Sequence, residues 1–337
     1  MKNIVLFICY TFLTVSCSSS QGKKWSHTDK EVVTKFSKTI TSSELKEMLY
    51  TYASDDFEGR NTGELGQKKA VNFIKDHYVD NGILSPIAID DYFQEIPSSY
   101  FNNQVKDSEN VLAYIKGSEK PDEVIIISAH LDHIGISKSG EINNGADDDG
   151  SGTVAILEIA EAFQTAVKSG YSPKRSILFL HVTGEEIGLF GSRYYADVDP
   201  IFPLENTVAN LNIDMIGRVD PKHEGKGNYL YLIGSDKLSK ELHDLSELVN
   251  KTFFNIEFDY TYNDDNDPNR FYYRSDHYNF AKNNIPVIFY FNGTHADYHK
   301  PSDTPDKINY EFLETRARLI FHTAWELANR TSRVKLN

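Results

Sequence analysis

The sequence is poor in cysteine, and both cysteines lie near the amino terminus. Cys9 and Cys17 are the only two in 337 residues, so residues 18–337 contain no disulfide and no thiolate. This excludes a cysteine nucleophile and a cysteine-rich structural zinc site from that part of the chain. A hydrophobic core must stabilise the fold, and any metal ion must be bound by His, Asp and Glu.

The sequence also lacks a basic tract and a long apolar run. Its formal net charge is −14, which argues against a nucleic-acid partner. The apolar run Ile4–Val15 is too short to cross a bilayer, and it follows Lys2. A short apolar run after a positive charge is typical of an export signal.

Residues 1–16 resemble the signal peptide of a bacterial lipoprotein. Ser16 is a small residue before Cys17, which would become the lipidated amino terminus, and three serines follow. Thr14 stands where such signals usually carry Leu, and an ordinary secretory signal cleaved nearby is the alternative. We expect an exported protein, anchored in the bacterial envelope through Cys17, with residues 17–40 as a lipidated tether.

Strands and helices alternate along most of the chain. Continuous Ile, Val, Leu and Phe runs between amphipathic segments predict an α/β fold, a three-layer sandwich with a central, mostly parallel mixed β-sheet flanked by helices. No internal repeat or linker interrupts residues 41–330, which we predict to be a single domain. The predicted strands are 110–117, 122–130, 175–183, 207–215, 228–234 and 285–291. The predicted helices are 41–54, which opens with Thr41 and Glu44 at capping-box spacing, 64–80, 151–166, 236–252 and 310–329.

Polar residues follow several of the predicted strands, where parallel sheets bind ligands. His130 and Asp132 are two residues apart at the end of an extended run, so alternation places them on the same side. The Asp132 carboxylate would then hold the His130 ring and fix its tautomer, as metal-ligating histidines require. His133 is expected to point to the opposite face and is the less favoured ligand.

Acidic residues follow the next strands. Glu185 and Glu186 are adjacent and point apart, so one suits a metal ion and the other a substrate water; a favourable helix start is the alternative. Asp214 lies in an apolar strand, where a buried carboxylate needs a cation. Arg218 is the alternative, structural partner. His299 precedes a Pro-containing turn, with Asp303 nearby.

The stretch "NNGADDDGSG" places Asp147, Asp148 and Asp149 side by side between glycines. A solvated loop tip is the simplest interpretation. Three adjacent carboxylates repel one another, however, unless a positive charge lies among them.

Weaker signals lie elsewhere. The aromatic-rich stretch 262–280 is expected to line a cleft, where Asp276 and His277 would either support the site or be purely structural. A calcium site is disfavoured, because the Asp264–Asp267 region lacks the Gly and terminal Glu of an EF-hand loop. His181, in an apolar strand, is expected to be a core histidine.

The motifs "AHLDH", "GADDDGSG", "TGEEIGLFGS", "NIDM" and "YHKPSDT", in that order, resemble those of the zinc peptidases of family M28. With "FEGRNTGELGQKKA" and "YRSDHYNF", the resemblance runs from about residue 41 to 329. It implies an α/β sheet that carries two cocatalytic Zn²⁺ ions. The domain that some relatives insert ahead of the metal region is absent, because residues 60–129 are too few to contain it.

The resemblance also implies roles for individual residues. The zinc ligands would be His130, Asp148, Glu186, Asp214 and His299. Asp148 would bridge the two ions, with His130 and Asp214 on one and Glu186 and His299 on the other. Glu185 would be the general base and Asp132 the residue that orients His130, while Asp147 and Asp149 would shape the loop.

The implied function is a two-zinc exopeptidase that removes N-terminal residues from peptides, with a metal-bridging hydroxide as nucleophile. Three alternatives remain: a carboxypeptidase- or dipeptidase-type relative, a single-zinc glutaminyl-cyclase-like aminoacyltransferase, and a non-catalytic binding protein. The first needs a cation for a substrate carboxylate. The residues expected to contact substrate or support the ligands are Arg218, Arg274, Asp276, His277, Tyr298 and Asp303.

Overall fold

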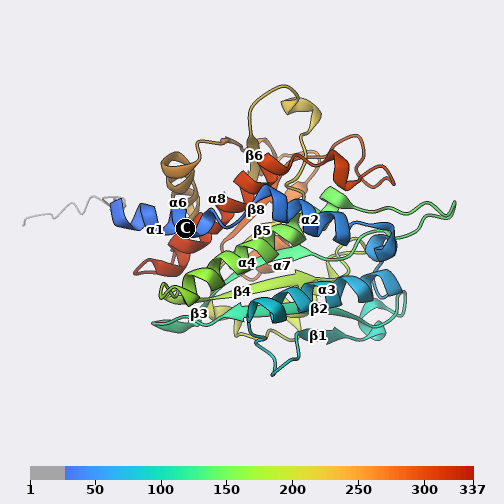
Figure 1. The fold of residues 1–337 in the computed structure, drawn as a ribbon, viewed down its shortest axis with the longest axis horizontal. Helices are drawn as coiled ribbons and strands as arrows, with labels where there is room; N and C mark the ends of the chain where they lie inside the picture. Colours follow the sequence, from blue (N-terminus) through green and yellow to red (C-terminus); the bar gives the residue numbers. More distant parts are fainter. Residues whose placement is uncertain (1–26) are drawn as a thin grey trace, which may run out of the picture.

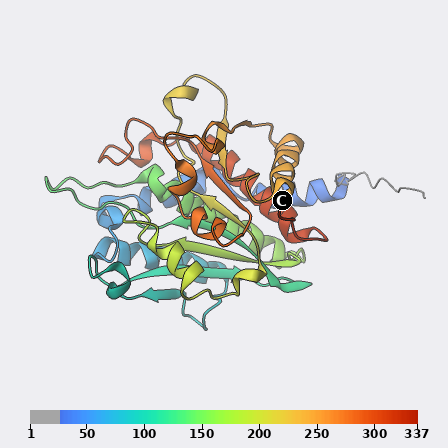
Figure 2. The same cartoon turned by 180° about the vertical axis from the view of Figure 1, so that it is seen from behind.

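The computed structural model describes residues 27–337, and the predicted signal peptide and lipidated Cys17 lie outside them. An eight-stranded mixed sheet lies between two layers of helices (Figures 1 and 2). This confirms the predicted three-layer α/β architecture. No helix in the described part of the chain is both long and apolar enough to span a bilayer.

The sheet has a parallel centre and mixed edges. Its strands are β1 Phe93–Ile96, β2 Ser108–Ile115, β3 Lys120–His130, β4 Arg175–Val182, β5 Thr207–Ile213, β6 Tyr229–Ile233, β7 Glu257–Asp259 and β8 Val287–Phe291. They lie in the order β1-β2-β4-β3-β5-β8-β6-β7. The four central strands β4, β3, β5 and β8 are parallel, so their carboxyl ends meet at one edge of the sheet.

Helices cover both faces of this sheet. They are α1 His27–Ser37, α2 Ser42–Tyr52, α3 Leu65–Asn81, α4 Gly152–Lys168, α5 Phe190–Asp197, α6 Lys240–Phe253, α7 His277–Ala281 and α8 Tyr310–Asn329. The main core joins one face of the sheet to α1, α2, α3, α4, α6 and α8, whereas α5 and α7 pack on the other face (Figures 1 and 2).

The central strand β3 shows why the sheet is buried on both sides. Ile125 and Ile127 contribute to the main core, and Val124 and Ile126 contribute to the core on the opposite face. All four are fully buried. A continuous apolar run therefore fills two cores at once, as expected for a central parallel strand.

Each predicted strand and helix is present, with boundaries that differ by a few residues. Thr41 caps α2, because its side chain accepts from the amide of Glu44, but the reciprocal bond of a capping box is absent, since the Thr41 amide donates to Glu158 instead. The structure adds β1, β7, α5 and α7, all too short for a clear periodicity.

The interpretation of residues 17–40 as a tether is wrong for its last part. Residues 27–37 form α1, and Val33 and Phe36 are buried in the main core. Phe36 stacks on Trp325 of α8, with 5.9 Å between ring centroids. Two apolar residues three positions apart suffice to dock this helix, although they are too few to give an obvious pattern.

Candidate metal centre

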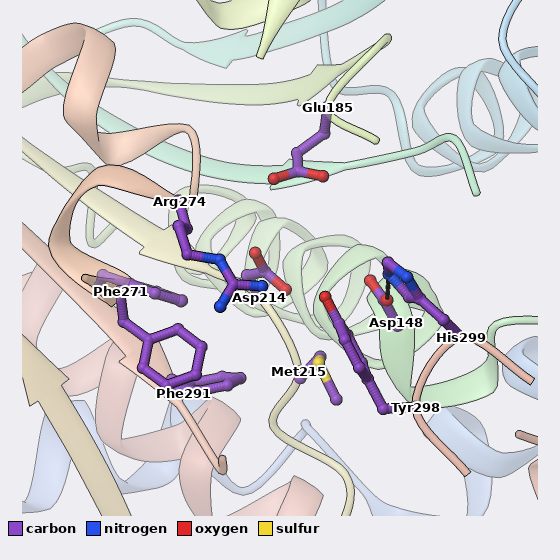
Figure 3. Close-up of a pocket in the computed structure, with 10 residues that line it drawn as sticks. Asp148, Glu185, Asp214, Met215, Phe271, Arg274, Phe291, Tyr298 and His299 are labelled. Carbon is purple, nitrogen blue, oxygen red and sulfur yellow. Dashed lines mark ion pairs between the residues drawn. The ribbon is translucent and has the colours of Figure 1, made fainter. Parts of the chain in front are cut away.

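The predicted site residues gather at the carboxyl edge of the four parallel strands. His130 is the last residue of β3, Glu185 and Glu186 follow β4, and Asp214 follows β5. Asp148 lies in the turn before α4. His299 follows β8, so five separate segments meet at one place, and Figure 3 shows several of these side chains around the same pocket.

Asp148 lies between two histidines. Its Oδ1 is 3.1 Å from His130 Nε2, and its Oδ2 is 3.0 Å from His299 Nε2. On the first side, His130 Nε2 is also 3.7 Å from Asp214 Oδ1. On the second, His299 Nε2 is 3.2 Å from Glu186 Oε2. The cluster therefore has two halves that share one carboxylate.

These separations suit metal ligands. Two atoms bound to one zinc ion at about 2.1 Å in tetrahedral geometry lie about 3.4 Å apart. Imidazole and carboxylate donors without sulfur are the ligand set of catalytic zinc sites. The donor set and its spacing thus fit a divalent cation in each half.

The electrostatics of the cluster also fit cations. Burial opposes the ionisation of Asp148, but His130 and His299 hold its pKa well below the usual range. Burial lowers the pKa of His299, yet Asp148 and Glu186 raise it to about 10. Burial also raises the pKa of Glu185 well above its usual value, and Glu186 adds to this shift. Crowded carboxylates that depend on positive neighbours are what a bound cation would stabilise.

Three groups in residues 27–337 bring His, Asp and Glu ligand atoms within 4.8 Å of one another. They are His130 with Glu185 and Glu186, His130 with Asp149 and Asp214, and His133 with Asp148 and Glu186. All three belong to this cluster, and the acidic stretch 264–267, disfavoured above as a calcium site, contributes to none of them.

The two outer aspartates of the triplet hold the backbone. The Asp149 carboxylate accepts from the amides of Gly152 and Met215, both at 3.0 Å. Asp147 Oδ1 accepts from the amide of Gly217 at 2.7 Å and from the Ser151 hydroxyl at 2.9 Å. These bonds join the turn before α4 to the end of β5, and Asp148 is left to face the histidines.

Asp132 contacts His130, but not as predicted. His130 Nδ1 donates to the main-chain carbonyl of Asp132 at 3.0 Å, whereas the carboxylate is 3.8 Å away. That carboxylate instead accepts from the Thr62 hydroxyl and from the amide of Glu185. The ring is still held with Nε2 toward the cluster, and the Asp132 side chain fixes the loop that carries Glu185.

The prediction that His133 points away from the site is wrong. Its ring is fully buried, and Nδ1 lies 2.7 Å from Glu186 Oε1. Alternation fails here because β3 ends at His130, so residues 131–133 lie outside the strand.

The two candidate arginines differ in their partners. Arg218 pairs with Asp297 at 2.8 Å and lies 3.5 Å from Asp303. Arg274 is exposed, lines the pocket, and forms no ion pair with the described acidic residues. Its guanidinium lies 4.8 Å from the ring centroid of Phe271. Arg274 is therefore the cation that remains available to a ligand.

The other predicted supporting residues have mixed outcomes. Tyr298 lines the pocket and stacks on His299 at 3.9 Å. Asp303 accepts from the amides of Asp147 and Asp148 and so fixes the turn. Asp276 is buried against Ser192.

Two further histidines have structural surroundings. His277 packs on Phe289, and burial lowers its pKa to about 3. His181 bonds the Tyr78 hydroxyl at 2.7 Å, as expected for a core histidine.

The pocket beside the cluster has one apolar wall. Its apolar lining residues are Met215, Phe271, Phe289 and Phe291. In Figure 3, Phe271 and Phe291 lie on one side and Asp148 and His299 on the other, with Glu185 above them. Phe271 lies in the stretch 262–280, which was expected to line a cleft, whereas no sequence pattern singled out Met215, Phe289 or Phe291.

Two polar residues were also missed. Ser275 donates to Asp214 Oδ2 at 2.7 Å. Arg60 is fully buried and donates to main-chain carbonyls beside the site, including that of Gly145 at 2.8 Å. Both lie in stretches that carry the family resemblance, and that resemblance is the sequence feature that could have identified them.

Comparison with known proteins agrees with this geometry. A model of peptidase family M28 matches residues 110–324. Aminopeptidase NAALADL1 of Rattus norvegicus is 34% identical over 123 residues, 36% of this chain and 15% of the rat protein. The probable glutamate carboxypeptidase LAMP1 of Arabidopsis thaliana is 34% identical over 106 residues, 32% of this chain and 14% of the plant protein. The chain thus matches only about a seventh of the length of these relatives.

Among solved structures, the LapA aminopeptidase of Legionella pneumophila has a TM-score of 0.68 to this chain. The sequences are 23% identical, and the superposition covers 93% of this chain and 79% of LapA. At this identity the likeness shows a shared fold.

Proposed function

The chain belongs to peptidase family M28, and on this premise we propose that it is a zinc-dependent exopeptidase that removes residues from the free amino terminus of peptides. The observation that supports this most directly is the arrangement of Asp148, with one oxygen toward His130 and the other toward His299. A carboxylate between two histidine–carboxylate halves suits two adjacent metal ions.

Each half would hold one Zn²⁺ ion. His130 and Asp214 would bind the first with Asp148, and Glu186 and His299 would bind the second with the same Asp148. Bound zinc would supply Lewis-acid chemistry, which polarises a carbonyl oxygen and makes water more acidic. The ligand roles of all five residues are part of the proposal.

Glu185 would move the proton. Its carboxylate lines the pocket next to Asp148 and Asp214. It would take a proton from the attacking water and return it to the leaving amine. Its raised pKa suits a group that accepts a proton during the reaction.

The pocket wall favours an apolar side chain at the cleaved amino terminus. Phe271, Phe289 and Phe291 offer aromatic surface next to the acidic cluster. The positively charged α-amino group of a peptide would face the carboxylates, whereas its side chain would pack on the rings.

Two experiments test this function. Peptides with free and with acetylated amino termini should be compared, and cleavage of acetylated peptides alone would refute the aminopeptidase proposal. Glu185→Gln should lower kcat about 10²–10⁴-fold while zinc content stays at the wild-type level. Unchanged turnover in this variant would refute the role of Glu185.

A second candidate is a peptidase that recognises a substrate carboxylate, such as a carboxypeptidase or dipeptidase. The specific observation in its favour is Arg274, which lines the pocket and has no acidic partner among residues 27–337. If Arg274→Met raises KM for dipeptides but leaves KM for the corresponding dipeptide amides unchanged, this candidate is favoured.

We also propose that the protein is exported and anchored through Cys17. The support is the apolar run and the Ser16-Cys17 pair. Wild type but not Cys17→Ser should incorporate labelled palmitate in a bacterial host. Equal labelling would refute the anchor.

A further inference from the structure

His133 has a contact that neither the family motifs nor the proposed roles explain. Its Nδ1 lies 2.7 Å from Glu186 Oε1, and the other oxygen of that carboxylate, Oε2, lies 3.2 Å from His299 Nε2. The ring also meets His299 edge-on, with 5.8 Å between centroids. His133 thus contacts the oxygen of Glu186 that His299 does not, and its Nδ1 also lies 3.8 Å from Asp148 Oδ2.

The surrounding backbone leaves room for this ring. Gly145 has φ of +52°, and a Cβ there would lie 2.5 Å from Cδ2 and 2.6 Å from Cγ of His133. Arg60 holds the carbonyl of Gly145, and its own carbonyl accepts from the amide of His133 at 3.2 Å. Gly145 thus leaves the space that the imidazole occupies, and Arg60 holds the backbone around it.

The partner of His133 sets it apart from the other buried histidines. Its Nε2 has no hydrogen-bond partner among the described residues, but the same is true of Nδ1 in His181 and in His322. In those two rings the paired nitrogen meets a hydroxyl, of Tyr78 and of Ser37 respectively. In His133 the paired nitrogen, Nδ1, faces a carboxylate oxygen of Glu186 and therefore carries the proton.

We propose that His133 is a positioning residue for the metal ligand Glu186. By donating from Nδ1 to Oε1 it fixes the rotation of the carboxylate, so that Oε2 alone faces Asp148 and His299. This rests on the proposed function only in that Glu186 binds a metal ion. Hydrogen bonds of this kind commonly change metal affinity 10–100-fold when removed.

The test is metal binding by the purified, metal-free full-length protein. His133→Phe keeps a ring of similar size but cannot donate, whereas His133→Asn places an amide nitrogen where Nδ1 lies. His322→Phe is the control, because His322 is also buried but sits in α8 among Phe253 and Phe254. Zn²⁺ affinities come from competition with a chelator, and Co²⁺ absorption reports the coordination geometry.

We expect His133→Phe to weaken one Zn²⁺ affinity 10–100-fold and to alter the Co²⁺ spectrum, and His133→Asn to restore most of both. His322→Phe should match the wild type. Affinities within twofold of wild type in His133→Phe would overturn the proposal. Complete loss of one ion in both His133 variants would also overturn it, because His133 would then be a ligand itself. The measurement needs no substrate, so a wild type that binds zinc but cleaves no peptide would refute the proposed function alone.

Discussion

Replacement of Arg60 tests how the loop beside the site is held. This buried guanidinium has no carboxylate partner among the described residues and instead donates to four main-chain carbonyls. They belong to Leu131 at 3.2 Å, Tyr52 at 3.3 Å, Asn144 at 2.7 Å and Gly145 at 2.8 Å. Arg60→Met removes all four bonds while keeping an apolar chain of similar length.

The expected loss of stability depends on which of the four carbonyls still accept a hydrogen bond in the variant. Leu131 O still accepts from the Tyr52 hydroxyl at 2.8 Å, and Gly145 O still accepts from the amide of Gly150 at 3.2 Å. The carbonyls of Tyr52 and Asn144 have no second donor within the described residues. The Tyr52 carbonyl is buried and the Asn144 carbonyl only partly so, so at about 1–3 kcal/mol for a buried unsatisfied group we expect the variant to lose at least this much of its free energy of unfolding. That is a large share of the roughly 5–15 kcal/mol available to a typical domain.

Urea unfolding measures this loss. Arg270→Met is the control, because Arg270 is exposed and we expect a change of less than about 0.5 kcal/mol there. A loss below about 1 kcal/mol in Arg60→Met would refute the reasoning, since it would mean that water or a rearranged backbone satisfies both carbonyls. A loss equal to that of the control would refute it equally.

Three other predictions can be tested by single measurements. Burial raises the pKa of Glu158 from 4.5 to about 8, so the fold keeps a proton that the unfolded chain releases, and stability should fall as the pH rises between these values. Glu158→Gln should remove this part of the pH dependence, and an unchanged slope in urea unfolding would contradict it. Gly145→Ala should lower zinc affinity and stability, because the added Cβ would lie 2.2 Å from the Asp148 carbonyl oxygen. Gly140→Ala is the control, because Gly140 also has a positive φ but a Cβ there would meet nothing within 4 Å. Equal effects of the two substitutions would show that crowding is not the cause. Removal of bound zinc should lower Tm. Adding Zn²⁺ at 100 times its Kd should then raise the free energy of unfolding by about 2.7 kcal/mol, so an unchanged Tm would argue against a zinc site.

The sequence predicts the central sheet well because the physics there is simple. Strands such as β3 and β4 are buried on both faces, so their apolar runs are continuous and easily seen. Three of the five motifs fall at the ends of β3, β4 and β5, where parallel strands meet, and the other two lie in the loops that follow β3 and β8. The clustering of His130, Asp148 and Asp214 therefore follows from the order of strands and motifs along the chain.

The errors lie where regular geometry ends. His133 was assigned to the wrong face because alternation was extended beyond the end of β3 at His130. Asp132 holds His130 through its carbonyl, and no pattern of side chains reveals a main-chain acceptor. The docking of α1 depends on Phe36 meeting Trp325, a contact between the two ends of the described chain.

The cluster at the ends of β3, β4, β5 and β8 exists only when all four strands are paired in register. His130 and His299 come from distant parts of the sequence and meet through the shared oxygens of Asp148. A chain that ended before β8 would keep His130, Asp148 and Asp214 yet would never close the second half. For the two-ion site proposed above, Co²⁺ absorption would therefore report the last step of tertiary assembly, because the second half of the cluster needs His299, which follows β8.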